Sequence, residues 1–361
     1  MYSGNTPSRF NKEYFNGNVN WISSGELKEH YIYSSKEQIS EEAAKNLTLL
    51  PIGTFVIAIY GLEAEGVRGT GSIIKEPSTI SQACMSFISK GAIENEFLYS
   101  WYKKHGNVIG IRYAQGTKQQ NLSYDILESF KIAYPCTKEQ KKLNKFITLL
   151  DERIATQNKI IEDLKKLKCA IIEKVYSEIQ GKEYSYGQLF DVVNERNKQM
   201  EYSNILSASQ EKGIVNREDL NLDIQFERNN INTYKIVREG DYVIHLRSFQ
   251  GGFAFSDKLG VCSPAYTILR PNNLLEYGYL SNYFTSQRFI KSLIIVTYGI
   301  RDGRSINVDE WFNMKISIPS REHQRYIVKV IGSFERKIEN EEAYAAHLSK
   351  QKQYLLRQMF V

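Results

Sequence analysis

The stretch Pro135-Cys-Thr-Lys-Glu-Gln140 opens a segment of helical periodicity that continues to about Tyr176, and the same chain holds a second copy of it. The copy opens with Pro319-Ser-Arg-Glu-His-Gln324 and continues to Phe360. Position 319 lies 184 residues after position 135, and this constant offset aligns the two copies without a gap. The rest of the chain is organised around this duplicated segment.

Apolar residues recur in both copies at alternating spacings of four and three, the heptad pattern typical of a coiled-coil seam. Polar residues interrupt the pattern at the same two places, Gln157 and Lys168 in the first copy and Glu341 and Lys352 in the second. Matched interruptions favour pairing of the two helices with each other over two independent amphipathic helices. The predicted seam residues are Leu143, Ile147, Leu150, Ile154, Ile161, Leu164, Ile327, Ile331, Phe334, Ile338, Leu348 and Leu355.

The sequence before each helix has mixed strand and helix composition in the same order. The turn and apolar strand at 50–57 correspond to 237–244, and the aromatic run at 97–102 corresponds to 279–284. Thr137 and Gln140 resemble a capping box, and the first long helix should measure roughly 60–66 Å. We predict an α+β fold with pseudo-two-fold symmetry: duplicated globular domains at 1–134 and 182–318, and long helices at 135–181 and 319–361.

Composition places the chain among ordinary soluble proteins. Of its 361 residues, 42% are hydrophobic and 24% charged. The four cysteines lack paired or metal-type spacing, which indicates reduced thiols in the cytoplasm and no metal site. No apolar run is long enough to span a bilayer, so no membrane partner is expected. The net charge of +6 and the 24 tyrosines are compatible with a polyanionic partner.

Motifs that carry catalysis are absent from the sequence. There is no nucleotide-binding P-loop, no H-E-x-x-H, no G-x-S-x-G and no Asn/Asp-Pro-Pro-aromatic segment of amino-methyltransferases. Glu26-Leu-Lys28 lacks the upstream Asp of a nuclease site, and Glu335-Arg-Lys337 lies on the predicted coil. We therefore expect no catalytic residue in this chain.

Polar, basic loops occur instead at equivalent places in the two halves. Arg, Gln and Asn are the side chains that read base edges, and neighbouring glycines allow the backbone to approach phosphate. Solvated surface loops are the simpler explanation for any single one of them. The predicted DNA-binding residues are Trp21, Tyr60, Arg68, Arg112, Lys118, Gln119, Gln120, Arg247, Gln250, Arg301 and Arg304.

The chain resembles the specificity subunits of Type I restriction-modification systems over essentially its whole length. The resemblance rests on the duplicated order and on Gly116-Thr-Lys-Gln-Gln-Asn-Leu122 leading to Ile132-Ala-Tyr-Pro135, with the matching run from Ser305 to Gln324. The opening Ser3-Gly-Asn-Thr-Pro-Ser8 with Val19-Asn-Trp-Ile22 is similar to a first target recognition domain.

The resemblance implies that each globular domain reads one half of a split sequence in double-stranded DNA, and that the helices pair antiparallel as a spacer. It implies docking of two modification (methyltransferase) subunits and a restriction/translocase subunit, which would carry the S-adenosylmethionine, ATP and Mg²⁺; the chain itself would hold no cofactor and be no enzyme. Two other readings stay open. One is a stand-alone DNA-modifying or DNA-cleaving enzyme with degenerate motifs, and the other is a coiled-coil adaptor that does not bind DNA.

One departure from the family pattern concerns the start of the first domain. The second domain begins with Tyr184-Ser-Tyr-Gly-Gln-Leu-Phe-Asp-Val-Val193, whereas the sequence starts abruptly at Met1-Tyr2-Ser3. Either the start codon lies upstream or the first domain closes without such a segment. The difference predicts a less stable first domain and a weaker head-to-tail closure between the ends of the chain.

Overall fold

The structure is a computed structural model that describes residues 1–64, 66–116, 118–209, 213–220, 228–245, 252–298 and 305–360. The chain forms two compact units. Unit 1 comprises Met1–Asn158 and the chain from Ala343 onward, and unit 2 comprises Lys159–Glu342. This division differs from the four predicted segments because each long helix contributes one half to each unit.

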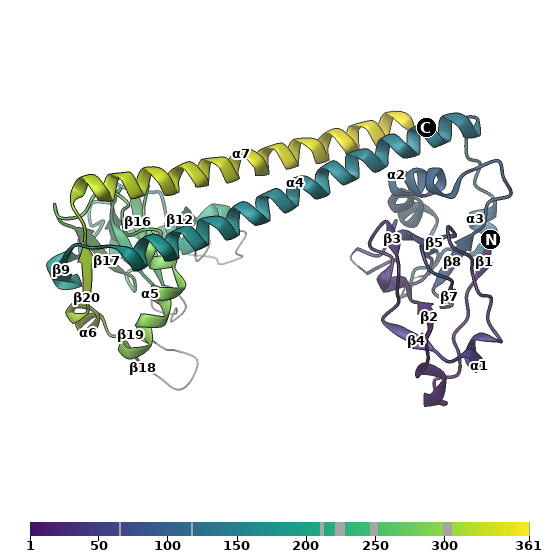
Figure 1. Ribbon diagram of the computed structural model, residues 1–361, viewed down its shortest axis with the longest axis horizontal. Coiled ribbons are helices and arrows are strands. Elements are labelled where there is room, and N and C mark those ends of the chain that lie inside the picture. Colours follow the sequence, from purple (N-terminus) through teal and green to yellow (C-terminus); the bar gives the residue numbers. More distant parts are fainter. Residues whose placement is uncertain are drawn as a thin grey trace. The chain divides into compact units, whose positions relative to one another are not determined.

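Unit 1 contains two small sheets that carry its core (Figure 1). The first has the order β1-β8-β5-β6-β3, and its strands are Tyr2–Ser3, Cys84–Phe87, Phe55–Ala58, Gly71–Ile74 and Tyr31–Ile32. The second has the order β4-β2-β7, with strands Glu37–Ile39, Val19–Ile22 and Ser78–Ile80. Three helices complete the domain, namely α1 (Glu41–Ala44), α2 (Asn95–Tyr113) and α3 (Tyr124–Glu128).

Unit 2 is built around the sheet β10-β17-β14-β15, with strands Phe190–Val193, Thr267–Pro271, Tyr242–Ile244 and Phe253–Phe255. Its two-stranded sheets are β11 (Leu206–Ser209) with β12 (Gly213–Asn216), β13 (Lys235–Val237) with β16 (Gly260–Cys262), β18 (Thr297–Tyr298) with β19 (Ser305–Ile306), and β20 (Lys315–Ile318) with β9 (Lys182–Ser185). Helices α5 (Gln287–Ser292) and α6 (Val308–Asn313) lie in the same unit.

The two units repeat one topology, which confirms the predicted duplication. In unit 1, β5 lies between β8 and β6 with antiparallel pairing on both sides. In unit 2, β14 lies in the same way between β17 and β15. The turn that leads into β8 also matches the turn that leads into β17, since Cys84 N–H donates to Ser81 O at 3.0 Å and Tyr266 N–H donates to Ser263 O at 3.1 Å.

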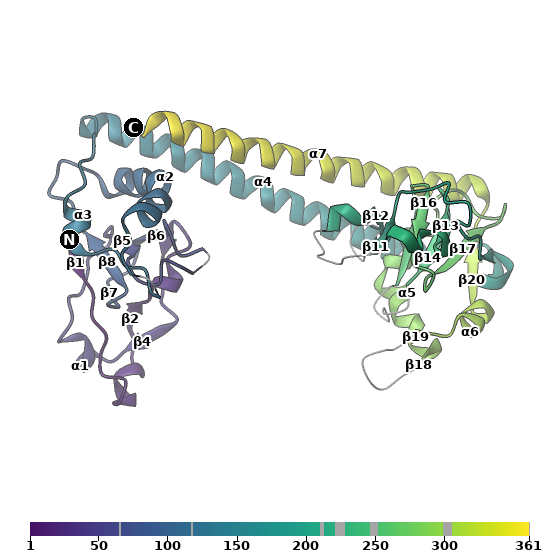
Figure 2. The same ribbon diagram turned by 180° about the vertical axis from the view of Figure 1, so that it is seen from behind.

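The long helices are α4 (Thr137–Glu178) and α7 (Arg321–Met359). Within unit 1 the end of α7 runs alongside the start of α4, as two opposite views show (Figures 1 and 2). Lys352 forms an ion pair with Asp151 in unit 1, and Lys168 forms one with Glu335 at 2.6 Å in unit 2. Higher numbers on one helix meet lower numbers on the other in both units, so the pairing is antiparallel.

Every one of the twelve predicted seam residues is buried or half-buried, and Ile147, Ile331 and Leu348 are among the fully buried ones. The polar interruptions have partners as well. Lys168 and Lys352, which occupy equivalent positions, each pair with an acidic residue of the opposite helix. Matched ion pairs inside a seam favour one register over others.

The segment 184–193, which opens the second globular domain, is part of the core of unit 2. Strand β9 pairs with β20, and Tyr186 stacks on Trp311 with ring centroids 4.2 Å apart. In unit 1 the segment equivalent to β20, residues 131–134, is not a strand and is mostly exposed. The C-terminal end nevertheless closes onto unit 1, because Phe360 is fully buried against Phe97 with ring centroids 5.1 Å apart.

Candidate nucleic-acid interface

Two of the loops predicted from the sequence meet in unit 1, and Gln120 joins them. The loop that follows β5 and the loop that follows α2 are held together by backbone and side chain. Gln120 O accepts from Leu62 N–H at 3.1 Å, and Gln120 N–H donates to the Glu63 carboxylate at 2.8 Å. The hydrogen bond donated by the Gln120 N–H holds the pKa of the exposed Glu63 carboxyl below its usual range. The two loops therefore form one surface.

The side chain of Arg68 is half-buried beneath this surface. Its Nη2 donates to Gln120 Oε1 at 2.6 Å, and its aliphatic stem covers Gly110 of α2, where an added Cβ would come within 3.2 Å of Arg68 Cγ. Gly69 and Gly106 approach closely in the same place, since a Cβ on Gly69 would lie 2.8 Å from the backbone of Asn107. Arg68 and Gln120 thus fix the loops against α2.

Four of the predicted residues in unit 1 remain available to a partner. Tyr60, at the end of β5, is 39% exposed, and Arg112, Lys118 and Gln119 are exposed as well. Arg112 lies in the last turn of α2, and Lys118 and Gln119 lie in the loop that follows it. A cationic pair beside an aromatic ring and an amide can contact phosphate and base edges of DNA.

Trp21 does not fit its predicted role of contacting DNA. Its side chain is only 4% exposed, and its indole Nε1 donates to Asn5 O at 3.0 Å. Phe15 packs edge-on against the ring at 5.6 Å, and the Arg9 guanidinium covers it. Trp21 therefore anchors the N-terminal segment to β2 and offers no face to a nucleic acid.

The predicted DNA-binding residues of unit 2 are Arg247, Gln250, Arg301 and Arg304, and all four lie outside the described residues. The following described residues are their neighbours in the sequence. His245 precedes the first group, and burial lowers its pKa. Before the second group, Arg288 and Lys291 are exposed on α5, and Ile294 and Ile295 are 68% and 70% exposed.

Unit 2 also holds basic residues that the sequence did not single out. An open cavity of about 630 Å³ is lined by Asn194, Glu195, Arg196, Lys198, Ile236 and Arg238. Arg196, Lys198 and Arg238 are exposed, while Glu195 pairs with Arg238 at 3.1 Å and with Arg270 at 3.5 Å. The signal in the sequence was the charge-rich run Asn194-Glu-Arg-Asn-Lys198.

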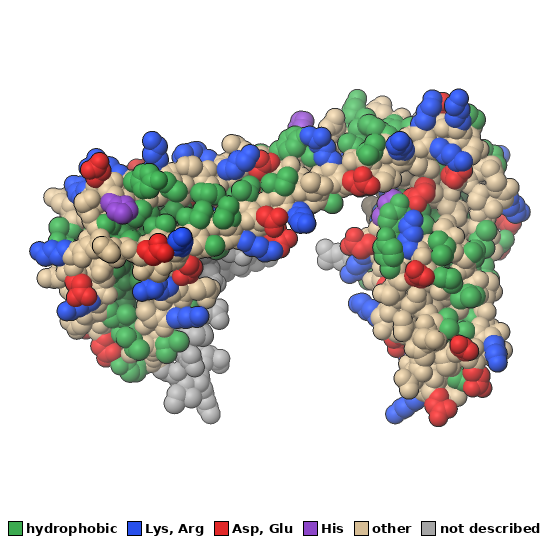
Figure 3. Space-filling model, viewed as in Figure 1, with side chains coloured by type: hydrophobic (Ala, Val, Ile, Leu, Met, Phe, Trp, Pro, Cys, Tyr) green, Lys and Arg blue, Asp and Glu red, His purple; other side chains and the backbone are tan. Residues whose placement is uncertain are grey.

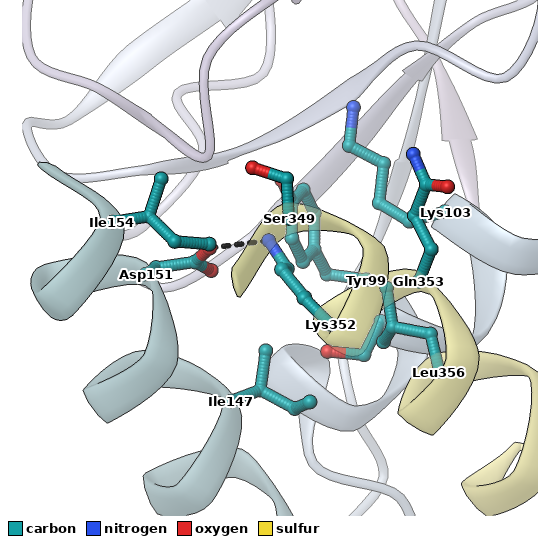
Figure 4. A pocket seen from close by; sticks show the side chains of 10 residues that line it. Tyr99, Lys103, Ile147, Asp151, Ile154, Ser349, Lys352, Gln353 and Leu356 are labelled. Carbon is teal, nitrogen blue, oxygen red and sulfur yellow. Dashed lines mark hydrogen bonds and ion pairs between the residues drawn. The ribbon is translucent and has the colours of Figure 1, made fainter. Parts of the chain in front are cut away.

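A second cavity, of about 350 Å³, lies in unit 1 where α2 meets the paired helices (Figure 4). The Asp151–Lys352 ion pair crosses its wall, and Tyr99 and Lys103 of α2 face the same space. Desolvation, followed by the nearby charge of Lys352, lowers the pKa of Lys103. The cavity is part of the contact through which the globular domain rests on its helices.

Within the described ranges no group of three or more His, Cys, Asp or Glu side chains is placed to hold a metal ion. No helix in the described part of the chain is both long and apolar enough to cross a membrane.

Known proteins resemble the chain in sequence and in fold. The MjaIX specificity subunit of Methanocaldococcus jannaschii is 27% identical over 197 residues, which is 52% of this chain and 44% of that protein. The EcoR124I/EcoR124II specificity subunit of Escherichia coli is 28% identical over 190 residues, 51% of this chain and 44% of that protein. The matched region thus spans less than half of each curated relative.

Solved structures agree in fold at low identity. The specificity subunit of M. genitalium covers 100% of this chain and 93% of its own, with a TM-score of 0.53 and 14% identity. A chain from a study of assembly and conformational transition of the type I system covers 94% of this chain and 90% of its own, with a TM-score of 0.62 and 15% identity.

The subunit from Thermoanaerobacter tengcongensis covers 95% of this chain and 90% of its own, with a TM-score of 0.53 and 16% identity. The family model described as the Type I restriction modification DNA specificity domain matches twice, at residues 2–166 and 181–349, and so covers both repeats. The chain belongs to the Type I restriction-modification DNA specificity domain family.

Proposed function

We propose that this chain is the DNA-specificity subunit of a Type I restriction-modification complex. Each unit reads one half of a bipartite, gapped target in double-stranded DNA, and the paired helices serve as spacer and as docking site. The chain is not itself an enzyme. The observation that carries the proposal is the repeat: two units of one topology, each with a polar stretch of sequence after its central strand, β5 or β14.

The surface of unit 1 supports contact with DNA. Arg112 and Lys118 supply exposed positive charge for phosphates, and Tyr60 and Gln119 supply exposed groups beside them. Arg68 and Gln120 hold the underlying loops in one arrangement. A surface of this kind gains affinity from released counterions and gains specificity from the few side chains that reach base edges.

The helices support a protein partner as well as each other. In unit 1, Phe146 and Leu149 of α4 are 42% and 53% exposed, and in unit 2 Ile160 and Leu167 are 42% and 48% exposed. Figure 3 shows hydrophobic side chains among the charged ones on the exposed helix surface. Apolar side chains of this size outside the seam suit a protein interface.

The partners that fit this role are two modification subunits, followed by a restriction/translocase subunit. Adenine methylation would be carried out by the modification subunits with S-adenosylmethionine. The ATP and Mg²⁺ of translocation and cleavage would bind the restriction subunit. This chain would supply sequence recognition to both activities.

DNA recognition by unit 1 can be tested with the chain bound to its methyltransferase. The double variant Arg112→Ala/Lys118→Ala should weaken binding of target and non-target DNA alike and reduce the salt dependence of binding by about two phosphate contacts. Lys45→Ala, which changes an exposed lysine just after α1, is the matched control. An unchanged affinity and salt slope in the double variant would contradict this surface.

Docking can be tested separately from DNA. Phe146→Glu and Leu149→Glu place charges on the exposed face of α4 and should abolish co-purification of the methyltransferase. Lys138→Glu, an exposed position in the first turn of the same helix, changes charge without removing an apolar contact. If all three variants retained the methyltransferase equally, this face would not be its docking site.

A further inference from the structure

One buried glutamine lies in the first turn of each long helix, at equivalent positions. Gln140 of α4 is 0% exposed and Gln324 of α7 is 1% exposed. The two helix starts are otherwise polar, and the neighbouring Glu139 and His323 are exposed. A buried amide persists only where its donors and acceptor are satisfied, so each glutamine should have hydrogen-bond partners.

Gln140 bonds to three backbone groups in two segments of unit 1. Its Oε1 accepts from Glu94 N–H at 2.8 Å, and its Nε2 donates to Ala92 O at 2.9 Å and to Pro135 O at 2.8 Å. Ala92 and Glu94 lie just before α2, and Pro135 lies just before α4. A single side chain therefore ties the start of α2 to the start of α4.

Gln324 makes the same three bonds in unit 2. Its Oε1 accepts from Glu276 N–H at 2.8 Å, and its Nε2 donates to Leu274 O and to Pro319 O, both at 3.0 Å. The pattern is reproduced atom for atom, although the globular sequences around it differ. The loop partners are offset by 182 residues, from 92 to 274, whereas the helices are offset by 184, so the bonds persist across a two-residue change in length.

Charged side chains add to both junctions. The carboxylate of Glu276 forms ion pairs with Arg321 at 3.0 Å and with Arg325 at 3.3 Å. In unit 1, Lys141 occupies the position of Arg325 and lies 3.9 Å from the carboxylate of Glu94. The contact between Lys141 and Glu94 is long and exposed, so it contributes little to stability. In unit 1 the amide of Gln140 is therefore the main polar link between the segment before α2 and the start of α4.

The segment that Gln140 holds leads directly to the candidate interface of unit 1. Glu94 is the residue before α2, and α2 carries Arg112 at its other end and packs Gly110 against Arg68. Fixing the first backbone N–H of this helix fixes its direction relative to α4. Two donors and one acceptor with separate targets leave the amide a single orientation, which a carboxylate or an apolar side chain of the same length cannot reproduce.

We propose that Gln140 and Gln324 are positioning residues that fix the orientation of each recognition domain on its helix, and so set the length of the gap between the two half-sites. The inference rests on the proposed function and assigns different roles to the loops and to the two glutamines. The loops select the bases, and the glutamines select the spacing at which both domains can bind together.

The test is an adenine-methylation map of DNA exposed to the methyltransferase complex assembled with Gln140→Met, Gln324→Met or the unchanged chain. Methionine keeps the length and volume of glutamine but makes none of the three bonds. Each variant should keep both half-site sequences, methylate the native gap between about tenfold and a hundredfold less efficiently, and accept neighbouring gap lengths. Gln351→Met, at an exposed glutamine on α7, is the matched control and should leave the map unchanged.

Hydrogen exchange in the absence of DNA gives a second readout. The amides of Glu94 in Gln140→Met, and of Glu276 in Gln324→Met, should exchange faster, while the interior of α2 keeps its protection. A wild-type chain that yields no gapped motif would refute the proposed function. A wild-type motif with an unchanged gap and efficiency in both variants would refute only the positioning role. Loss of protection along the whole of α2 would also refute it, because the glutamine would then be required for folding.

Discussion

The closure of the chain onto unit 1 leads to a quantitative prediction for Phe360→Ala. Phe360 is the last described residue; its side chain is fully buried, its ring lies 5.1 Å from Phe97, and its carbonyl accepts from Lys104 Nζ. Removing a buried phenyl ring costs about 3–5 kcal/mol, through lost transfer free energy and the cavity that remains. That is a large part of the roughly 5–15 kcal/mol by which a domain is stable.

Hydrogen exchange is the suitable assay because two units need not unfold together. For Phe360→Ala we expect amides in α2 and β5 of unit 1 to lose protection by roughly a hundredfold to several thousandfold, at about 1.4 kcal/mol per factor of ten. Amides in β14 and β17 of unit 2 should keep their protection. The loss should come without any change in helix content at low temperature.

The matched control is Tyr354→Ala, on α7 near its C-terminal end, whereas Phe360 directly follows that helix. Tyr354 is 62% exposed, so its removal should change stability by less than about 0.5 kcal/mol. Equal protection in Phe360→Ala and Tyr354→Ala would refute the reasoning, because the C-terminal end would then contribute nothing to unit 1. Equal losses in both units would refute the assignment of Phe360 to unit 1.

Three further predictions concern single contacts. Lys352→Glu should lower coil stability by about 0.5–1 kcal/mol, and the double change with Asp151→Lys should restore it in a thermal-unfolding measurement. Burial, with the charge of Lys104, lowers the pKa of His105, so the unfolded chain binds more protons than the folded one. The free energy of unfolding should therefore fall as the pH drops below about 6.5. In His105→Gln this fall should be less steep. Trp311→Ala should cost about 3–5 kcal/mol in unit 2 by removing the partner of Tyr186, with exchange of β20 amides as the readout.

The helices could be predicted from the sequence because their signal is local and repeated. A heptad spacing such as Leu143, Ile147 and Leu150 fixes which face is apolar whatever lies opposite, and the second copy identifies the partner. The pairing of Lys352 with Asp151 could not be predicted in the same way. Antiparallel and parallel arrangements bring different residues opposite a given seam position, and the heptads alone are compatible with both.

The candidate interface was predictable in its loops but not in the roles of its residues. Residue type indicated that Arg68, Gln120 and Trp21 could contact DNA. Whether a side chain faces solvent depends on tertiary packing, and packing turned Arg68 and Gln120 into a mutual contact and buried Trp21 beneath Arg9. The role of Gln140 was hidden for a similar reason, since its partner Glu94 lies 46 residues away.

The most direct test of the account is the adenine-methylation map of DNA from cells that express this chain with its candidate methyltransferase, compared with cells that express either protein alone. We predict a split motif with one fixed gap that appears only when both proteins are present. Replacing residues 182–318 should then change one half of the motif and leave the other half intact. Absence of new methylation, with the same methyltransferase active beside another specificity subunit, would contradict the claim that this chain selects the DNA target.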